Sequence, residues 1–359
     1  MRLWPRIQAV ATAVPSHVIE QDDVRKRIDR VFAGGVRDLD RFMPIYANAG
    51  VDTRYSCVPL DWYEQDHSWA ERNALYVEHA LRLLTDAAVR CLDQAGLDAR
   101  SIDSIVTVST TGIATPSLDA ALMDRVAFRH TVCRMPIFGL GCAGGVIGLA
   151  RAASLAQAAP GSRVLCLVVE PCSLAFRRRD VSKSNIVATA LFGDGAAAVL
   201  ISTDATGPAP GPAIIACGEH TWPDTLDVMG WGVDSDGLSV IFSADIPSLI
   251  RRSFKEALEA FLAHAEIPAG DIDQFLCHPG GAKVLDALED VLGIPRGGLG
   301  HSRDVLRDYG NMSAVTVLFV LARALSTGTL GRRVLLSALG PGFTVGFMVL
   351  DNDGDSPPA

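Results

Sequence analysis

The chain has 359 residues, of which 49% are hydrophobic and 20% are charged, and its formal net charge is −9 at pH 7. This length suits one large or two medium-sized domains with a sizeable core, and the negative charge argues against general nucleic-acid binding. The eight cysteines form no Cys-x-x-Cys pair and show no zinc-type spacing, so no metal site is expected and the cysteines suit the reducing cytoplasm.

The first half of the chain predicts strands and helices in alternation. An apolar run at 7–14 follows two arginines, but it is short and Gln8 interrupts it, so it indicates a strand rather than a signal peptide. Apolar residues at helical spacing between 77 and 92 predict an amphipathic helix. Further along, small residues predict a helix at 146–158, and apolar runs predict buried strands at 164–169 and 197–201.

The second half continues in the same manner. Asp245 and Pro247 give a start signal for an amphipathic helix that includes 250–262. Apolar runs predict strands at 214–217, 334–338 and 345–350, and the polar, proline-containing end at 351–359 is typical of a solvated tail. The chain contains no run of about 18 consecutive apolar residues, so no transmembrane helix is expected.

Two segments of the chain carry the same pattern. Segments 92–108 and 262–278 both read as helix, turn, Ile-Asp and apolar strand. Ile102 in the first matches Ile272 in the second, an offset of 170 residues (272 − 102) that is close to half of the chain. The pattern therefore predicts an internal duplication.

Strands that alternate with helices predict an α/β protein built of layers. The clearest linker, rich in proline and glycine, is at 203–212. We therefore expect two halves, residues 1–205 and residues 206–359.

Cys142 stands in the run Phe-Gly-Leu-Gly-Cys-Ala-Gly-Gly-Val, between a strand-like approach and the small-residue helix. The glycines allow backbone and substrate to come close, and a helix N-terminus favours a thiolate. Taken alone, the residue also fits a buried structural cysteine in a tight turn. Its setting predicts a nucleophile only together with other groups.

His278 and Asn311 occupy similar strand-to-helix or glycine turns downstream. His278 ends an apolar strand before Pro279, and Asn311 follows Gly310 and precedes a predicted helix at 312–326. Each has a plain structural alternative, a hydrogen-bonded core histidine and a helix N-cap. With Cys142 they supply a thiol nucleophile, a base and an amide donor.

Five motifs resemble the type III polyketide synthases, the chalcone synthase-like family. They occur in the family order and span nearly the whole chain: Gly-Leu-Gly-Cys-Ala-Gly-Gly at 139–145, Leu-Phe-Gly-Asp-Gly-Ala-Ala-Ala at 191–198, Cys-His-Pro-Gly-Gly at 277–281, Tyr-Gly-Asn-Met-Ser-Ala at 309–314 and Gly-Pro-Gly-Phe-Thr at 340–344. The resemblance implies a duplicated thiolase fold with five layers, α-β-α-β-α, and a homodimer.

The resemblance also implies the chemistry. Cys142 would take the acyl group of an acyl-CoA as a thioester, with His278 lowering its thiol pKa by pairing with the thiolate. Malonyl-CoA would lose CO2 to give an enolate, which His278 and Asn311 would stabilise through N–H donors. The enolate carbon would then attack the thioester, and repetition followed by cyclisation would need no metal or redox cofactor.

Substrate-binding residues follow from the same resemblance. Phe192 matches a family phenylalanine between the CoA tunnel and the cavity, and Val240 replaces the second gate phenylalanine of the plant enzymes. Cys172 and Ala175 stand where chalcone synthases place threonines, which suggests a long aliphatic pocket. Two further candidates are Thr111 and Thr115, and Thr115 aligns with a plant methionine that reaches across the dimer.

The CoA entrance is less well defined. Arg41 matches one basic residue of the family's phosphate-binding set, while the other two positions hold Pro44 and Asn48. Arg54 and Lys283 are candidate replacements, and Lys283 begins a helix after a glycine pair, where anions are favoured.

Together these features predict a cytoplasmic, homodimeric type III polyketide synthase. It would extend a medium- or long-chain fatty acyl-CoA with malonyl-CoA to an alkylpyrone or alkylresorcinol-type product. The alternatives are a synthase that makes a naphthol-type product from malonyl-CoA alone, a single-condensation ketoacyl synthase, and a non-catalytic acyl-CoA-binding scaffold. In the ketoacyl synthases the histidine is typically followed by Gln-Ala-Asn, whereas Pro279 follows His278 here.

Overall fold

Strands and helices alternate along the chain, as the sequence predicts. The structure is a computed structural model that describes residues 3–32, 35, 41–203 and 211–352. The expected boundary at 205/206 and most of the expected tail lie outside the described residues.

The described strands are β1 (Arg6–Ala13), β2 (His17–Glu20), β3 (Thr53–Ser56), β4 (Ser104–Val108), β5 (Cys133–Ile137), β6 (Arg163–Pro171), β7 (Asp194–Ser202), β8 (Ala213–Thr221), β9 (Met229–Asp234), β10 (Gly237–Phe242), β11 (Gln274–Cys277), β12 (Arg333–Gly340) and β13 (Thr344–Asp351). The described α-helices are α1 (Gln21–Val31), α2 (Met43–Ala47), α3 (Trp69–Ala95), α4 (Leu118–Leu122), α5 (Gly144–Ala158), α6 (Lys183–Leu191), α7 (Ile246–His264), α8 (Ala282–Leu292), α9 (Gly300–Tyr309) and α10 (Thr316–Ser326).

Nine strands are joined in one hydrogen-bonded order, β11-β12-β13-β8-β1-β7-β6-β4-β5. The pairs β4–β5, β4–β6 and β11–β12 are parallel, and the other neighbours in this order are antiparallel. Strands β1 and β8 meet at a single residue pair, Arg6 and Ala213. The order therefore consists of two sheets that touch at one corner.

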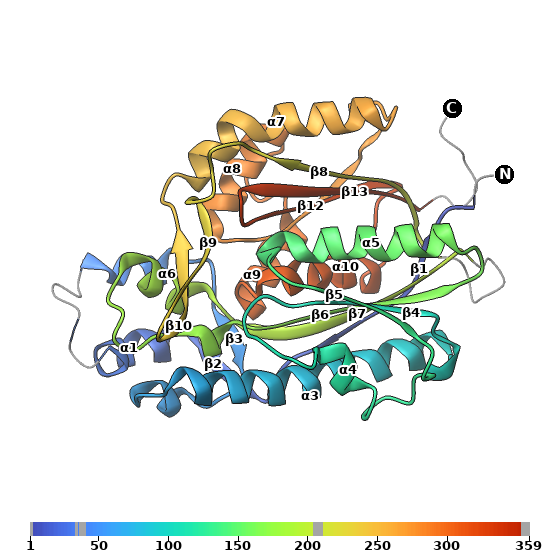
Figure 1. Cartoon of the computed structure of the whole chain (residues 1–359). Helices are drawn as coiled ribbons and strands as arrows, with labels where there is room; N and C mark the ends of the chain where they lie inside the picture. Colours follow the sequence, from blue (N-terminus) through green and yellow to red (C-terminus); the bar gives the residue numbers. More distant parts are fainter. Residues whose placement is uncertain (1–2, 33–34, 36–40, 204–210, 353–359) are drawn as a thin grey trace.

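Five layers result from this arrangement (Figure 1). Helices α7 and α8 cover the sheet that contains β8, β12 and β13, and α3 covers the far side of the sheet that contains β1, β4, β6 and β7. Helices α5 and α10 lie between the two sheets. They are buried on almost all sides, which fits their small and apolar composition. The expected α-β-α-β-α layering is confirmed.

The internal duplication is visible in the hydrogen bonds. The amide N–H of Asp103 donates to Arg163 O, and its carboxylate accepts from the amide of Arg163. Asp273 and Arg333, 170 residues later (273 − 103 and 333 − 163), make the same two contacts. The same pair of hydrogen bonds between a turn and a neighbouring strand thus occurs once in each half.

Two glycines let the central helix α5 pack closely, Gly145 on the second half of the chain and Gly148 on the first. A Cβ atom at Gly145 would lie 2.2 Å from the carbonyl oxygen of Ala314, and one at Gly148 would lie 2.5 Å from a methyl group of Val108. Only glycine permits this approach without displacing backbone. It places the first turn of α5 directly against the segment that follows Asn311.

Most predicted elements are confirmed, with two differences near the site. The expected helix at 312–326 starts as a 3-10 turn, Ser313–Val315, before α10 begins. The hairpin of β9 and β10 has no counterpart among the sequence predictions. Its residues 230–232 contain two glycines, which gave no strand signal.

Candidate active site

Cys142 lies in a 3-10 turn, Gly141–Ala143, between β5 and α5. Gly141 has a φ of +46°, and a Cβ there would lie 2.5 Å from the ring of Pro341, so the turn depends on glycine. The Cys142 side chain is buried, and burial raises the pKa of its thiol to about 12. The predicted strand-to-helix turn is confirmed, and the resting cysteine is a neutral thiol.

His278 and Asn311 line the same small cavity as Cys142, a hollow of about 20 Å³ between the two halves of the chain. His278 follows the last residue of β11, and its amide donates to Ser337 O at 2.8 Å. Neither ring nitrogen has a hydrogen-bond partner among the described residues. Burial lowers the pKa of the ring to about 3, so the imidazole is neutral.

Asn311 is held by two hydrogen bonds. Its Oδ1 accepts from the amide of Ser313 at 2.8 Å, and its Nδ2 donates to the carbonyl oxygen of Gly280 at 3.2 Å. A primary amide has two N–H groups. One N–H of Nδ2 is therefore fixed on Gly280, and hydrogen bonding of the Asn311 side chain to Cys142 lowers the pKa of that thiol against the larger effect of burial.

One expectation about Cys142 is wrong. The sequence predicted that His278 pairs with a Cys142 thiolate and lowers its pKa, but the pKa of Cys142 is raised. Burial is the largest cause of that increase, and the carboxyl group of Glu170 adds to it. The thiol instead donates to Ser313 Oγ at 3.7 Å. The resting sulfur therefore keeps its proton.

Glu170 is a buried acid beside this site that the sequence analysis did not single out. Its Oε2 accepts from the amides of Thr110 and Thr111 at 3.0 and 3.1 Å and from the Thr111 hydroxyl at 2.7 Å, while Oε1 has no partner among the described residues. Burial raises the pKa of Glu170 to about 7. An acidic residue near the end of the otherwise apolar strand β6 is the signal that was available.

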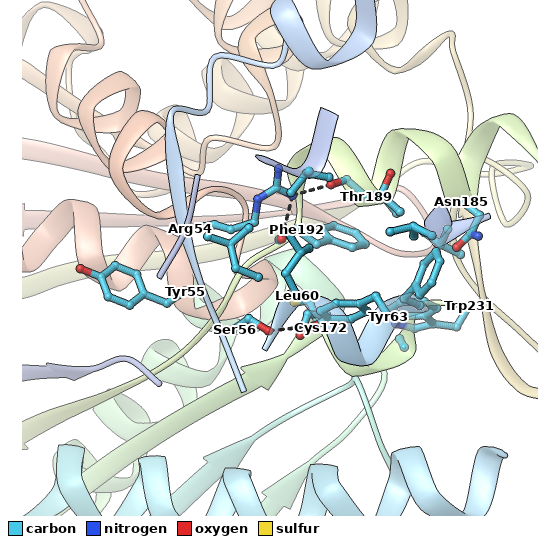
Figure 2. Close-up of a pocket in the computed structure, with 18 residues that line it drawn as sticks. Arg54, Tyr55, Ser56, Leu60, Tyr63, Cys172, Asn185, Thr189, Phe192 and Trp231 are labelled. Carbon is cyan, nitrogen blue, oxygen red and sulfur yellow. Dashed lines mark hydrogen bonds between the residues drawn. The ribbon is translucent and has the colours of Figure 1, made fainter. Parts of the chain in front are cut away.

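Four of the predicted substrate-binding residues line a second cavity of about 70 Å³. These are Phe192, Val240, Cys172 and Ala175, and Figure 2 draws the cavity with its lining side chains. The lining is mostly apolar and comes from the N-terminal segments, the turn at 172–176 after β6, the α6 region and the β9–β10 hairpin. We call it the apolar pocket and call the cavity of Cys142 the reaction cavity.

The remaining two substrate-binding candidates lie elsewhere. The Thr111 hydroxyl is buried on Glu170, and Thr115 is exposed in the loop that precedes α4. Neither contributes to the lining of the two cavities.

Phe192 separates the two cavities. Its ring lies 5.9 Å from that of Phe242, which lines the reaction cavity, and 6.5 Å from that of Trp231, which lines the apolar pocket. Its backbone also bridges to Asn311. The thiol of Cys172, in the apolar pocket, has its pKa raised by burial and then by the charges of Glu170 and other acidic groups, Cys142 among them. The two cavities are therefore close neighbours.

The structure places the three CoA-binding candidates differently. Arg54 is buried, and its guanidinium donates to Gln21 Oε1 and to the carbonyl oxygens of Thr189 and Phe192. Burial lowers its pKa to about 10. Arg54 therefore anchors the segment that contains Phe192. Because these N–H groups already bond to protein oxygens, Arg54 does not fit a contact with a phosphate at the CoA entrance.

Arg41 and Lys283 are exposed. Lys283 lies in the first turn of α8, and the next residue, Val284, lines the reaction cavity. These two side chains stay predictions for the CoA entrance.

The fold and the site together define a condensing acyltransferase of the thiolase fold. The family model "Chalcone and stilbene synthases, N-terminal domain" matches residues 5–205, and the corresponding C-terminal domain matches residues 214–352. The chain belongs to this family, the type III polyketide synthases.

Similar proteins come from several bacteria. The 1,3,6,8-tetrahydroxynaphthalene synthase of Streptomyces peucetius is 38% identical over 96% of this chain and 92% of its own length. The alpha-pyrone synthesis polyketide synthase-like Pks18 of Mycobacterium tuberculosis is 29% identical over 96% and 90%. The crystal structure of 1,3,6,8-tetrahydroxynaphthalene synthase from Streptomyces coelicolor superposes with a TM-score of 0.91 at 28% identity, covering 97% of this chain and 99% of that one.

Family membership confirms the predicted enzyme class. The chain is an acyltransferase that forms carbon–carbon bonds by decarboxylating condensation of CoA-linked substrates, without a further cofactor. The single-condensation ketoacyl synthase and the non-catalytic scaffold are set aside. Within the described residues, no group of three or more histidine, cysteine or acidic side chains is placed to hold a metal ion, and no helix has the length and apolarity to cross a membrane.

Proposed function

We propose that the enzyme loads a medium- or long-chain fatty acyl-CoA on Cys142 and extends it repeatedly with malonyl-CoA, and that the product is an alkylpyrone or an alkylresorcinol-type compound. The observation that carries this proposal is the apolar pocket behind Phe192. Val240, Cys172 and Ala175 contribute aliphatic or small side chains to a wall that also contains aromatic rings. Burying one methylene group of a chain there contributes about 0.8 kcal/mol.

The proposed mechanism uses the neutral state of both catalytic groups. As the Cys142 sulfur attacks the thioester carbonyl, His278 accepts the thiol proton, and the C–S bond to CoA breaks. CoA leaves as its thiol after taking up a proton. Because burial keeps the imidazole of His278 neutral, a ring nitrogen is open to accept that proton.

Condensation follows in the same cavity. Malonyl-CoA loses CO2, and negative charge develops on its thioester oxygen. An amide N–H of Asn311 and a ring N–H of His278 donate hydrogen bonds to that oxygen. The enolate carbon then bonds to the Cys142 thioester carbon while the C–S bond to Cys142 breaks, and the sulfur leaves as a thiolate that regains its proton from water. Rings around the cavity exclude water, which protects the reactive intermediates.

The test is a reaction with a ladder of saturated acyl-CoA starters and malonyl-CoA, followed by mass analysis of the products. Products whose masses rise in step with the starter support the proposal. A fatty starter that never appears in a product contradicts it.

A second candidate is a naphthol-type product made from malonyl-CoA alone. It is favoured by the similarity to the tetrahydroxynaphthalene synthases in sequence and fold. Malonyl-CoA as the only substrate distinguishes the two candidates. An aromatic product that forms in that reaction, unchanged when fatty acyl-CoA is added, supports the naphthol reading.

We also propose that the chain forms a homodimer. Strand β5 ends the strand order and pairs with β4 alone among the described strands. Met135 on β5 and Phe138 after it are 36% and 61% exposed. Exposed apolar side chains beside an unpaired strand edge are a ready surface for a second copy, and light scattering should report about twice the chain mass of 38.1 kDa. A monomer at micromolar concentration contradicts this.

All eight cysteines are free, which supports a reducing, cytoplasmic location.

A further inference from the structure

A third hollow lies on the other side of the apolar pocket. It is a surface groove of about 420 Å³, much larger than the pocket. Two side chains, those of Tyr63 and Phe176, line both hollows. These two rings therefore form the partition between the apolar pocket and the groove.

The partition is well braced. The rings of Tyr63 and Phe176 meet edge to face with centroids 5.8 Å apart, and Phe32 packs edge-on against Phe176 at 5.5 Å. The Tyr63 hydroxyl bonds to Ser56 Oγ at 2.8 Å. The backbone carbonyl of Phe176 accepts from the buried guanidinium of Arg72 at 2.7 Å. Edge-to-face packing and fixed hydrogen bonds hold both rings in place.

The two sides of the partition differ in polarity. Beyond it the groove is lined by ion-paired groups, among them Arg177 with Asp236 and Arg179 with Asp66. On the inner side the neighbours are Val24, Val31 and other apolar side chains. An alkyl chain gains by burial up to the two rings and gains little in the charged groove beyond them.

We propose that Tyr63 and Phe176 close the far end of the apolar pocket and set the longest acyl chain that the enzyme accepts. The proposal rests on the proposed function, because it takes the pocket to be the site of the fatty starter. Phe192 then stands at the inner end of the chain, next to the reaction cavity, and the Tyr63–Phe176 partition at its outer end. Figure 2 draws both Phe192 and Tyr63 around this one pocket.

Removal of the Phe176 ring opens the pocket into the groove. Phe176→Ala should shift the starter length of maximal kcat/KM upward by at least one two-carbon step. Each methylene that gains a buried position is worth up to about fourfold in selectivity. Phe176→Leu keeps most of the packing and should shift the optimum in the same direction by less.

A matched control is Phe261→Ala on α7. Phe261 is a partly buried ring that stacks on Phe347 at 5.2 Å and belongs to neither hollow. Its loss should lower the melting temperature and leave the length optimum in place. An unchanged optimum in folded Phe176→Ala and Phe176→Leu proteins overturns the proposal.

Binding separates this inference from the proposed function. Saturated fatty acids of increasing length are used to displace a fluorescent fatty acid from the wild-type enzyme and from the two Phe176 variants. A longer binding optimum in the variants supports the partition even if no fatty starter is turned over, in which case only the proposed function fails. An identical binding profile in wild type and variants overturns the partition, whatever the products are.

Discussion

The reaction cavity and the apolar pocket lie on opposite sides of Phe192 and differ in how their polar groups are satisfied. In the reaction cavity, both ring nitrogens of His278 lack partners among the described residues. In the apolar pocket, polar groups such as Ser56 Oγ and Asn185 Nδ2 already bond to protein atoms. Unpaired buried groups are costly to a fold. The two His278 nitrogens carry such a cost where charge must be stabilised during the reaction, whereas the one unpaired side-chain atom among the described lining of the apolar pocket, Arg54 Nε, belongs to a guanidinium that is otherwise hydrogen-bonded to protein oxygens.

We infer from this difference that the reaction cavity sets the rate of the chemical steps and the apolar pocket sets the choice of starter. Changes in the reaction cavity should lower the rate for every starter, because they remove groups that meet the developing charge. Changes in the apolar pocket should alter the ratio between starters, because the pocket contributes shape and apolar surface. The following predictions test that separation.

The largest effect is expected from Cys142→Ala. Removal of the nucleophilic sulfur should abolish condensation with all starters while the melting temperature stays near that of the wild type. Intact-protein mass spectrometry after incubation with an acyl-CoA should show an adduct on the wild type and none on the variant. An adduct that persists on Cys142→Ala places the nucleophile elsewhere.

Asn311→Ala should come next. It removes an N–H donor that matters as enolate charge develops, so turnover should fall on the order of 10²–10³. The fall should be similar for short and long starters. Decarboxylation of malonyl-CoA, measured as CO2 release, should decrease in parallel. A wild-type rate of decarboxylation means that Asn311 acts only through its bonds to Ser313 and Gly280.

Val240→Phe should leave the chemistry intact and change selection. Val240 lines the apolar pocket from β10, so a ring there takes space from the chain. Displacing two methylene groups lowers the long-to-short ratio of kcat/KM by up to about 15-fold.

Overpacking also costs stability, roughly 1–3 kcal/mol, so melting temperatures must accompany the Val240→Phe kinetics. An unchanged ratio in a folded variant shows that the chain does not pass Val240. The fatty-starter proposal then loses its main support.

The smallest effect concerns pH and stability. The folded pKa of His278 is about 3 against 6.5, so its contribution is present above pH 6.5 and is lost as pH falls toward 3. The folded pKa of Glu170 is about 7 against 4.5, so its contribution is present below pH 4.5 and is lost as pH rises toward 7. Between pH 4.5 and 6.5 the contribution of His278 to the free energy of unfolding rises with pH, while that of Glu170 falls.

Two substitutions should separate these slopes. Over that window the unfolding free energy of His278→Gln should decline with rising pH relative to wild type, and that of Glu170→Gln should increase. Each difference should be roughly 1 kcal/mol per pH unit. Urea unfolding at several pH values measures both, and parallel pH profiles in the three proteins would contradict the assignment.

Local signals in the sequence were sufficient to single out the candidate catalytic residues and an α/β fold of two similar halves, while the five-layered arrangement followed from the family resemblance. Glycine-rich turns at the ends of strands marked Cys142 and His278, and the 170-residue repeat indicated two equivalent halves. These features depend on residues that are near one another in the chain, so periodicity and turn chemistry reveal them.

Only the tertiary structure decides which side chains are buried and which ones line two cavities at once. Arg54 looked like an available cation, yet folding surrounds it with carbonyl oxygens from the Thr189–Phe192 segment. Glu170, and the partition of Tyr63 and Phe176, likewise acquire their roles from contacts with distant segments. The elevated pKa of Cys142 has the same origin, since desolvation depends on all the atoms that surround a group in space and not on its neighbours in sequence.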